Sequence, residues 1–558
     1  MSFTFIASAA DWARIAPELV LIGMTLLVMI TDLLLPQTGR TPKERGAANF
    51  LVLPLVSLLG IAGALAATIL LFIFGDGQRA FSGMIGSDWG SLYAYLIILS
   101  ASGLGILLSP AYLKRLNLVH QGEYYALMLL ATTGMLLMAA ATSFMMVFVG
   151  LELLSLALYI LCGFVTRRPG SQESSMKYFL LSSFASAFLL YGIAMIYGAT
   201  GSTSFAGVTQ FLVQSGAHHT VLLLVGMGLL IVGFAFKISA VPFQAWTPDV
   251  YDGAPAPVTA FMSVGTKAAA LIAFARVFVI VLHPVQGEWR EIILAITILT
   301  IVGGNILALV QSNVKRLLAY SSIAHAGYLL IGVVAGSTGN RLGLAAILFY
   351  LFCYTFLNLG AFGVVSVLER ADNTGSSLSD LRGLWYRRPL LAALLAFFLL
   401  SLAGFPPMAG FAAKYYLFYT ALVSGYPELL IIGVLASILG MYYYLKVIAA
   451  MFMEREKEVV VSNMVSASTL PPLEKRVSGK LGKAVTPPTR GGTAVAVKTP
   501  AVAKTTAVIE SAVETEKIPA IGWTTWAALA ITVAGALLAG TGLAFWLIDL
   551  AVRAAGMM

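Results

Sequence analysis

The sequence predicts an all-α integral membrane protein with about fourteen transmembrane helices, and three observations support this prediction. Of the 558 residues, 59% are hydrophobic and only 11% are charged, whereas a soluble domain carries roughly 25% charged residues. The mean hydropathy is +0.90. The apolar residues also gather in runs of roughly 20, the length at which a helix crosses a hydrocarbon core of about 30 Å.

The apolar runs place each predicted helix along the chain. The first run has no basic segment before it and no cleavage site after it, so we expect it to be retained as a span. The predicted helices cover residues 15–35, 49–74, 91–110, 124–141, 144–165, 178–199, 221–246, 256–281, 291–312, 317–336, 342–368, 389–423, 428–450 and 521–548.

The loops give an independent indication of orientation. Lys and Arg accumulate after odd-numbered helices, as at Lys114 and Arg115, and are sparse after even-numbered ones. Because basic residues favour cytoplasmic loops, this alternation predicts an even number of spans with both termini on the outer side. The loop 248–255 is an exception, since it should face the cytoplasm yet carries Asp249, Asp252 and no base.

Residues 454–519 differ in composition from the rest of the chain. They are rich in Pro, Thr, Ala, Lys and Glu and have almost no aromatic residues. Such a segment cannot bury enough apolar surface to fold. We therefore expect a disordered cytoplasmic insertion before the last helix, with a short amphipathic or docking helix within it as the alternative.

Several classes of chemistry are excluded by the motifs that the chain lacks. Cys162 and Cys353 form no CxxC pair, and the five histidines form no HExxH motif, so the chain alone builds neither an iron–sulfur cluster nor a zinc site. It also has no phosphate-binding or dinucleotide-binding glycine motif. The net charge of +9 is spread among loops, which fits a membrane protein and not a nucleic-acid binder.

Four charged residues lie in the middle of predicted spans. An ionised side chain at the bilayer centre costs at least about 2.5–3.5 kcal/mol, so a membrane helix that retains one usually uses it. One lysine could instead extend its stem so that the ammonium reaches the interface, and a lone glutamate could form a structural ion pair. Three lysines together with a glutamate favour function over these alternatives. The four residues are Glu152, Lys237, Lys267 and Lys414.

Two of these lysines lie beside predicted helix breaks. Pro242 interrupts the seventh helix after Lys237, and Gly404, Pro406 and Pro407 interrupt the twelfth, because proline removes a backbone hydrogen bond and crowds the preceding turn. Broken backbone at membrane depth is tolerated only where protein or a water-filled cavity satisfies it. Matched breaks five helices apart are typical of inverted repeats around a transport site, although a simple kink is the alternative for either break alone.

Four segments carry a resemblance to a known family. The chain resembles the antiporter-like subunit N of bacterial NADH:quinone oxidoreductase (complex I), is similar to the corresponding chloroplast and cyanobacterial subunits, and is more distantly similar to subunits of multi-subunit sodium/proton antiporters. The resemblance covers about residues 122–445. It rests on the strings GLELLSLALYIL, PDVYDGAPAPVTAFMSVGTKAA, KRLLAYSSIAHAGYLL and SLAGFPPMAGFAAKYYLF.

The resemblance implies an arrangement of segments and partners. Helices one to three would occupy residues 1–123, two inverted five-helix repeats would occupy 124–281 and 291–450, and the last helix would lie in 520–558. The chain would hold no cofactor, while NADH, FMN, iron–sulfur clusters and quinone would belong to partner subunits. It would lie among the other membrane subunits and lipids of the cell inner (plasma) membrane, connected through them to a peripheral redox arm.

The resemblance also implies roles for the buried polar residues. The glutamate of helix five pairs with the lysine of helix seven, a lysine in helix eight links two half-channels, and a lysine in helix twelve leads outward. Two further residues of helix ten line a polar axis. These roles fall on Glu152, Lys237, Lys267, Lys414, His325 and Tyr328.

The predicted function is proton translocation coupled to quinone reduction elsewhere in the complex. Protons would pass from Lys237 through water and Lys267 to Lys414. The alternatives are a subunit of a cation/proton antiporter, which could use the same lysines, and a structural scaffold, which needs none of them. One departure from the family is Gln244, where many relatives have histidine; a second is the length of the insertion after Met453.

Overall fold

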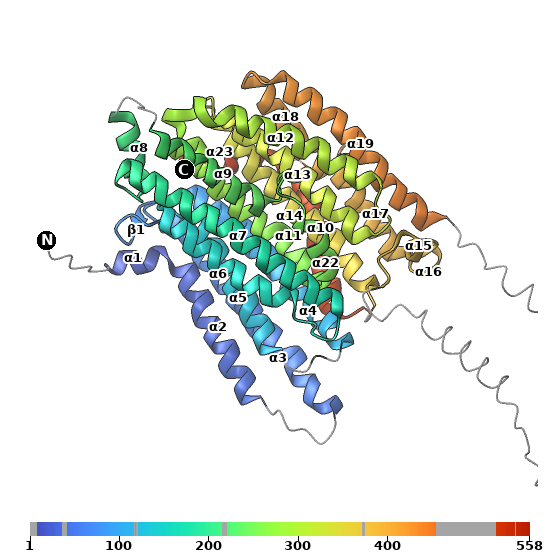
Figure 1. The fold of residues 1–558 in the computed structure, drawn as a ribbon. Coiled ribbons are helices and arrows are strands. Elements are labelled where there is room, and N and C mark those ends of the chain that lie inside the picture. The colour runs from blue at the N-terminus through green and yellow to red at the C-terminus, as the bar shows by residue number, and fades with distance from the viewer. Residues whose placement is uncertain are drawn as a thin grey trace, which may run out of the picture. The chain divides into compact units, whose positions relative to one another are not determined.

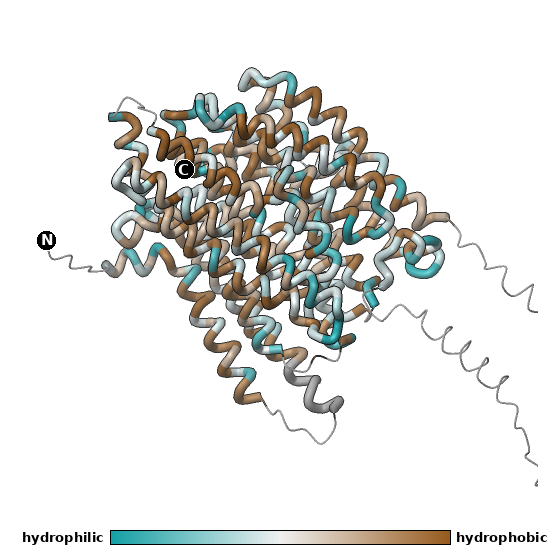
Figure 2. Tube along the Cα trace, viewed as in Figure 1, coloured by the Kyte–Doolittle hydropathy of each residue, from teal (hydrophilic) through white to brown (hydrophobic). Residues whose placement is uncertain are grey.

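Apolar helices with charged or polar ends make up nearly all of the described chain (Figures 1 and 2). The computed structural model describes residues 8–35, 42–116, 118, 121–214, 220–370, 374–453, 521–541 and 543–558, with backbone only for 42–49. The predicted insertion at 454–519 lies outside the described residues. In the described part, the sole sheet is an antiparallel hairpin of β1 (Arg79–Ala80) and β2 (Ile85–Gly86).

The helices of the first half begin with α1 and end with a π-helical turn at the end of α11. They are α1 (Ala9–Arg14), α2 (Ala16–Leu34), α3 (Pro42–Phe74), α4 (Trp89–Arg115), α5 (Gly122–Ala139), α6 (Phe144–Cys162), α7 (Pro169–Thr200), α8 (Phe205–Gln214), α9 (Val221–Ile238), α10 (Trp246–Gly253), α11 (Ala256–Ala275) and the π-helix η1 (Arg276–Val281).

The second half begins with a 3-10 turn and ends close to the C-terminus. Its helices are η2 (His283–Val285), α12 (Gln286–Leu309), α13 (Val314–Gly336), α14 (Leu342–Leu368), α15 (Leu378–Leu381), α16 (Leu384–Arg387), α17 (Pro389–Ala403), α18 (Ala409–Val423), α19 (Pro427–Phe452), α22 (Trp523–Gly540) and α23 (Leu543–Gly556).

The number of membrane crossings agrees with the prediction. In the described residues, thirteen helices are long and apolar enough to span a bilayer. The shorter helices α17 and α18 together occupy the predicted twelfth span, 389–423, and are separated by its predicted break. An all-α integral membrane fold is therefore confirmed.

Several boundaries differ from those that hydropathy predicts. The seventh predicted helix, 221–246, is shorter in the structure, where α9 ends at Ile238 and the separate helix α10 begins at Trp246. The last predicted helix divides into α22 and α23. At this division Gly540 lies so close to the backbone at the start of α18 that a β-carbon would be 2.8 Å from the nitrogen of Ala409. Hydropathy alone carries no signal for such close backbone packing.

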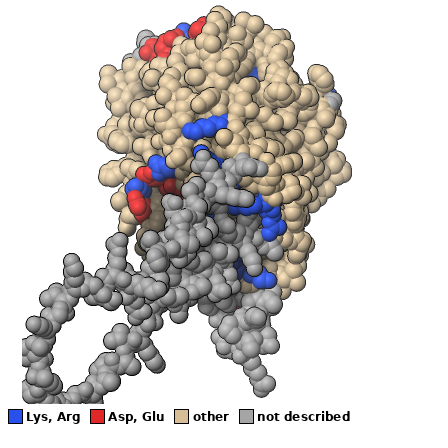
Figure 3. All heavy atoms as spheres, turned by 90° about the vertical axis from the view of Figure 1, so that its right-hand side faces the viewer, with Lys and Arg blue, Asp and Glu red and all other residues tan. Residues whose placement is uncertain are grey.

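The central helices are nearly enclosed by the others. In the most apolar windows of α11 and α13, 94% of residues are buried, against 28% for α2 and α3. In Figure 1, α11 and α14 lie inside the bundle and α2 and α3 lie at its edge. Figure 3 shows a face on which charged side chains occupy only a few patches. Lys267 on α11 and His325 on α13, which are 1% and 4% exposed, are therefore surrounded by protein.

Two successive sets of helices pack in the same order. Helix α5 packs on α6 and α6 on α7, just as α12 packs on α13 and α13 on α14. The fourth member of each set is broken: α9 and α10 in the first set, α17 and α18 in the second. The two sets therefore share one packing order, and the broken helix is the fourth member in each set.

Candidate functional site

Lys237 lies in the last turn of α9, and its ammonium is held inside the protein. The residue is 2% exposed. Its Nζ donates hydrogen bonds to Ser155 Oγ of α6 (2.7 Å) and to Tyr178 OH of α7 (3.2 Å) and lies 5.2 Å from the centre of the Tyr178 ring. The ammonium therefore does not reach towards a membrane surface, which argues against the snorkelling alternative.

Glu152 lies on α6, the helix that carries Ser155, but it is not a direct hydrogen-bond or ion-pair partner of the Lys237 ammonium. It precedes Ser155 by three residues, so both face the same side of α6. No ion pair joins it to Lys237 among the described residues, and its buried Oε1 has no hydrogen-bond partner there. Hydroxyl groups of Ser155 and Tyr178 occupy the positions in direct contact with Lys237, and the pairing with Glu152 that the family resemblance implies stays a prediction.

The break after α9 lies at the predicted position. Ser239 adopts a left-handed conformation (φ +66°), and the Val241–Pro242 peptide bond is cis. Trp246 Nε1 donates a hydrogen bond to the carbonyl of Phe236 (3.0 Å), and the amide of Val241 donates to Thr300 Oγ1 (2.9 Å). Protein groups therefore satisfy the backbone that the break frees, as a membrane interior requires.

Lys267 lies in the middle of α11 and is 1% exposed. Its Nζ donates hydrogen bonds to the carbonyl oxygen (2.7 Å) and Oγ (2.6 Å) of Ser322 on α13. The same Oγ accepts a hydrogen bond from Tyr354 OH of α14 (2.9 Å). Three central helices thus meet at this ammonium, and a serine that the sequence analysis did not single out is its main partner.

His325 and Tyr328 extend the polar line along α13. His325 Nδ1 lies 2.5 Å from Tyr350 OH, and its Nε2 lies 3.2 Å from Tyr444 OH. Tyr328 OH accepts a hydrogen bond from Asn305 Nδ2 (3.1 Å). Because His325 and Tyr328 are three residues apart on one helix, they share a face, which lies between Lys267 and the next lysine.

Lys414 lies beside the second break. It is 6% exposed, donates a hydrogen bond to the carbonyl of Ala403 at the end of α17 (3.1 Å), and lies 5.1 Å from the centre of the Tyr328 ring. Gly404 takes a left-handed conformation (φ +89°), and the Pro406–Pro407 bond is cis. The lysine therefore satisfies the carbonyl that the predicted break frees.

A cavity adjoins the second break. It has a volume of about 360 Å³ and is lined by Gly404, Lys414 and Ser437 among mostly apolar side chains of α18 and α19. Water can be held in such a space where polar groups line it. Lys414 thus borders a cavity large enough for several water molecules.

The sequence analysis missed the neutral partners of the lysines. Ser155, Tyr178, Ser322 and Tyr354 contact an ammonium directly or through one atom. Their only sequence signal is spacing, since Ser155 follows Glu152 by three residues. No group of three or more His, Cys, Asp or Glu residues that could hold a metal ion exists among the described residues.

Comparisons with known proteins identify relatives of this chain. Residues 141–440 match the family model described as the NADH:quinone oxidoreductase/Mrp antiporter transmembrane region. The chain is 43% identical over 444 residues to NADH-quinone oxidoreductase subunit N of Trichlorobacter lovleyi, covering 80% of this chain and 88% of that protein. It is 42% identical over 460 residues to subunit N 1 of Koribacter versatilis, covering 80% and 87%.

Solved structures show the same fold. A chain of respiratory complex I from Thermus thermophilus matches with a TM-score of 0.69 and 30% identity, covering 96% of this chain and 99% of that one. A chain of the Mrp complex from Dietzia sp. matches with a TM-score of 0.73 at 20% identity, covering 98% and 97%, and it shows the fold alone. From these matches over most of its length, the chain belongs to the NADH-quinone oxidoreductase subunit N family.

Proposed function

We propose that this chain carries protons across the membrane as a subunit of an NADH:quinone oxidoreductase, and that it holds no redox cofactor. NADH oxidation and quinone reduction would take place in partner subunits, which include the other membrane subunits and the peripheral redox arm. The family of the chain and its two broken helices support this proposal. The chain would contribute translocation to an enzyme complex whose electron transfer occurs elsewhere.

The observation that carries the proposal is the burial of three ammonium groups inside one helix bundle. Lys237, Lys267 and Lys414 are 2%, 1% and 6% exposed, and each donates hydrogen bonds to protein atoms inside the bundle. Keeping a charge at this depth is expensive. Hydrogen bonds to neutral groups hold each ammonium in place, and this makes the three lysines candidates for accepting and passing on a proton.

The residues would act in sequence. A proton would enter at Lys237, pass by water and hydroxyl groups to Lys267, and continue along the α13 face to Lys414 and the outer side; the direction follows the family. Glu152, which lies about one helical turn from Ser155 on α6, would modulate Lys237, because a carboxylate that approaches an ammonium favours its charged form. Since the groups are coupled, the network titrates as a unit.

The membrane arrangement forms part of the same proposal. Residues 124–281 and 291–450 would be the two inverted repeats, with helices one to three before them and residues 520–558 after the insertion. The loop charges support placing both termini on the outer side of the cell inner (plasma) membrane.

Replacement of Lys237 by Ala tests this function. We expect the assembled complex to retain its subunits but to pump fewer protons per NADH oxidised, measured by proton uptake into inverted membrane vesicles. Lys446→Ala is the matched control, because Lys446 on α19 is also partly buried and lies near backbone carbonyls at the end of α12 (3.4 and 3.5 Å). Normal pumping by a fully assembled K237A complex would refute the proposal.

The alternative, a subunit of a cation/proton antiporter, predicts different partners. Purifying the native assembly in mild detergent and identifying its subunits by mass spectrometry distinguishes the two. Co-purification of flavin- and iron–sulfur-containing subunits supports the oxidoreductase, whereas a set of membrane subunits without them supports the antiporter.

A further inference from the structure

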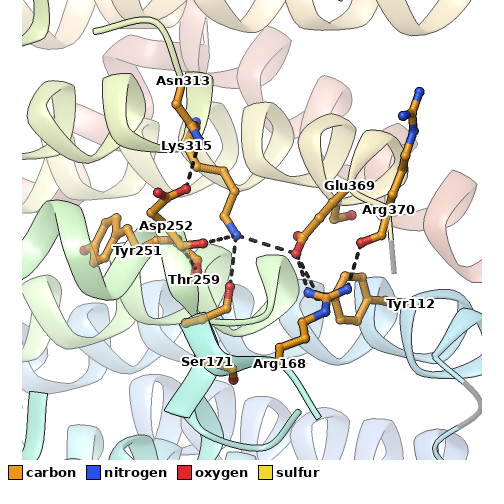
Figure 4. Close-up of polar contacts among 12 residues, drawn as sticks. Tyr112, Arg168, Ser171, Tyr251, Asp252, Thr259, Asn313, Lys315, Glu369 and Arg370 are labelled. Atoms are coloured by element: carbon orange, nitrogen blue, oxygen red, sulfur yellow. Dashed lines mark hydrogen bonds and ion pairs between the residues drawn. The ribbon is translucent and has the colours of Figure 1, made fainter. Parts of the chain in front are cut away.

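A buried cluster of charges, separate from Lys237, Lys267 and Lys414, joins distant parts of the chain (Figure 4). Its centre is Glu369, which follows α14 and whose side chain is fully buried. Glu369 Oε1 accepts hydrogen bonds from Arg168 Nη1 (2.7 Å) and Tyr112 OH (3.0 Å) and lies 3.6 Å from Lys315 Nζ. The Glu369 carboxylate and the hydroxyl of Tyr112 hold the pKa of Arg168, which precedes α7, above its ordinary value although burial acts to lower it.

Lys315 connects this cluster to the short helix α10. Its Nζ donates hydrogen bonds to the carbonyls of Asp252 (2.7 Å) and Ala254 (3.0 Å) at the C-terminal end of α10. The last carbonyls of a helix lack partners within the helix and carry the negative end of its dipole. The ammonium of Lys315, which belongs to α13, therefore caps α10.

The opposite end of α10 contacts the surroundings of Lys237. Trp246, its first residue, stacks on Tyr178 with ring centres 4.8 Å apart and an interplanar angle of 15°. Its Nε1 donates to the carbonyl of Phe236, next to Lys237, and Tyr178 OH accepts a hydrogen bond from Lys237. The N-terminal end of α10 therefore contacts the backbone beside Lys237 and also Tyr178, a hydrogen-bond partner of Lys237.

Ion pairs along α10 account for the acidic loop that violates the charge rule. Asp249 pairs with Lys177 of α7 (2.8 Å) and Arg316 of α13 (2.9 Å). Burial alone would raise the pKa of Asp249, but hydrogen bonds from these two cations hold it below its ordinary value. Asp252 accepts a hydrogen bond from Asn313 Nδ2 (3.0 Å). Arg316 Nη1 also lies 3.8 Å from Asp252 Oδ2, so both acids face basic residues of other helices.

We propose that Lys315 and Glu369 are positioning residues that fasten α10 to α13, so that α10 transmits the position of the second repeat to the surroundings of Lys237. We call α10 with its contacts to Lys315 and Arg316 the α10 bridge. This inference rests on the proposed function, because it assigns a partner helix to the proton-carrying Lys237. Helix α13 also carries Ser322, the partner of Lys267, so one helix contacts both halves of the relay.

The buried charge cluster around Glu369 is better explained by fixing one arrangement of helices than by adding stability. A buried ion pair seldom adds net stability over a well-packed apolar core and is best attested where it specifies one arrangement. Coupling between two sites requires an element that both of them bias. The α10 bridge contacts the surroundings of Lys237 through Trp246 and Tyr178, and it contacts α13 through Lys315, so it has the contacts that such an element needs.

The first test removes the cap. Lys315→Met in the whole complex should lower the number of protons pumped per NADH at unchanged subunit content, and Lys315→Arg should restore most of it, since an arginine can still donate to the α10 carbonyls and Glu369. Lys446→Met is the matched control, because Lys446 donates its hydrogen bonds to the carbonyls of Leu309 and Gln311 at the end of α12 and not to α10. Pumping by K315M equal to that of K446M overturns the inference.

The second test restores the α10 bridge covalently and does not depend on K315M assembling. Asp249 and Arg316 have side chains 35% and 33% exposed, so cysteines at both positions can be joined by a short bifunctional thiol reagent. Cys162 and Cys353 are buried and stay unreacted. Cross-linking of D249C/R316C should raise the proton-to-NADH ratio towards that of the unaltered complex, also in the K315M background.

The outcomes separate this inference from the proposed function. If the cross-link stops pumping, α10 must part from α13 during turnover and the α10 bridge is refuted. If K237A abolishes pumping while K315M and the cross-link have no effect, the relay stands and the α10 bridge falls. If K237A pumps normally, the proposed function fails regardless of the results for α10.

Discussion

Ser322→Ala is the most informative single substitution near the three buried lysines. The hydroxyl accepts one hydrogen bond from the Lys267 ammonium (2.6 Å) and one from Tyr354 OH (2.9 Å), while the carbonyl of the same serine keeps its bond to Lys267 (2.7 Å). The substitution therefore removes one charge-assisted hydrogen bond, worth about 1.5–3 kcal/mol, from the protonated lysine. A step that passes through protonated Lys267 should slow about 10- to 150-fold.

Two companion variants fix the cause of this effect. Ser322→Thr keeps the hydroxyl and should pump nearly normally. Tyr354→Phe removes only a neutral hydrogen bond, worth about 0.5–1.5 kcal/mol, so its effect should be smaller than that of S322A. The assay is proton uptake by inverted vesicles with the NADH:quinone rate measured with and without an uncoupler, after subunit content has been matched on native gels.

One result would refute the reasoning. If K267A severely impairs pumping while an assembled S322A complex pumps at the normal ratio, the hydroxyl does not stabilise the charged lysine during turnover. The hydrogen bonds of Lys267 would then be structural, and the route would have to pass the lysine by another group.

The remaining predictions concern stability. Glu369→Gln leaves two buried cations without their carboxylate, so we expect the free energy of unfolding to fall by about 3–5 kcal/mol. The purified complex should then melt at a lower temperature, and Glu369→Asp should lower it less. Equal melting temperatures of E369Q and the unaltered complex would contradict this. Gly253→Ala places a β-carbon 2.3 Å from the carbonyl oxygen of Gly170, so overpacking should cost about 1–3 kcal/mol, which a chemical denaturation or thermal shift series would detect. The hydrogen bond from Arg14 lowers the pKa of Asp76 to about 2. A lowered carboxyl pKa adds stability above the unfolded value of about 3.9 that is lost as pH falls towards 2; because Asp76 is half exposed, Asp76→Asn should cost at most about 1 kcal/mol, and less in high salt.

The sequence by itself determined the membrane fold, the positions of the two breaks and the three buried lysines. These features are local: hydrocarbon length sets the size of each apolar run, proline and glycine chemistry sets each break, and the cost of a charge in a membrane singles out each lysine. The structure interrupts the helices near both predicted breaks: α17 ends directly before Gly404, whereas α9 ends at Ile238, a few residues before Pro242. Such features need no knowledge of which helix lies beside which.

Only the tertiary structure decided what each ammonium contacts. Lys237 meets hydroxyls of Ser155 and Tyr178 and not the carboxylate of Glu152, and Lys267 meets Ser322, 55 residues away. Serine and tyrosine are neutral and cost little in a membrane helix, so they give no hydropathy signal. Their roles follow from packing alone.

The charge cluster shows the same limit for ionised groups. Arg168 and Glu369 are 201 residues apart yet form one buried ion pair, and hydropathy placed both in loops. The acids of residues 248–255 contradicted the charge rule until helices α7 and α13 supplied their cations. Side-chain charge is read from the sequence, but its neutralisation is a property of the helices that fold around it, because the partners are brought together only by long-range packing.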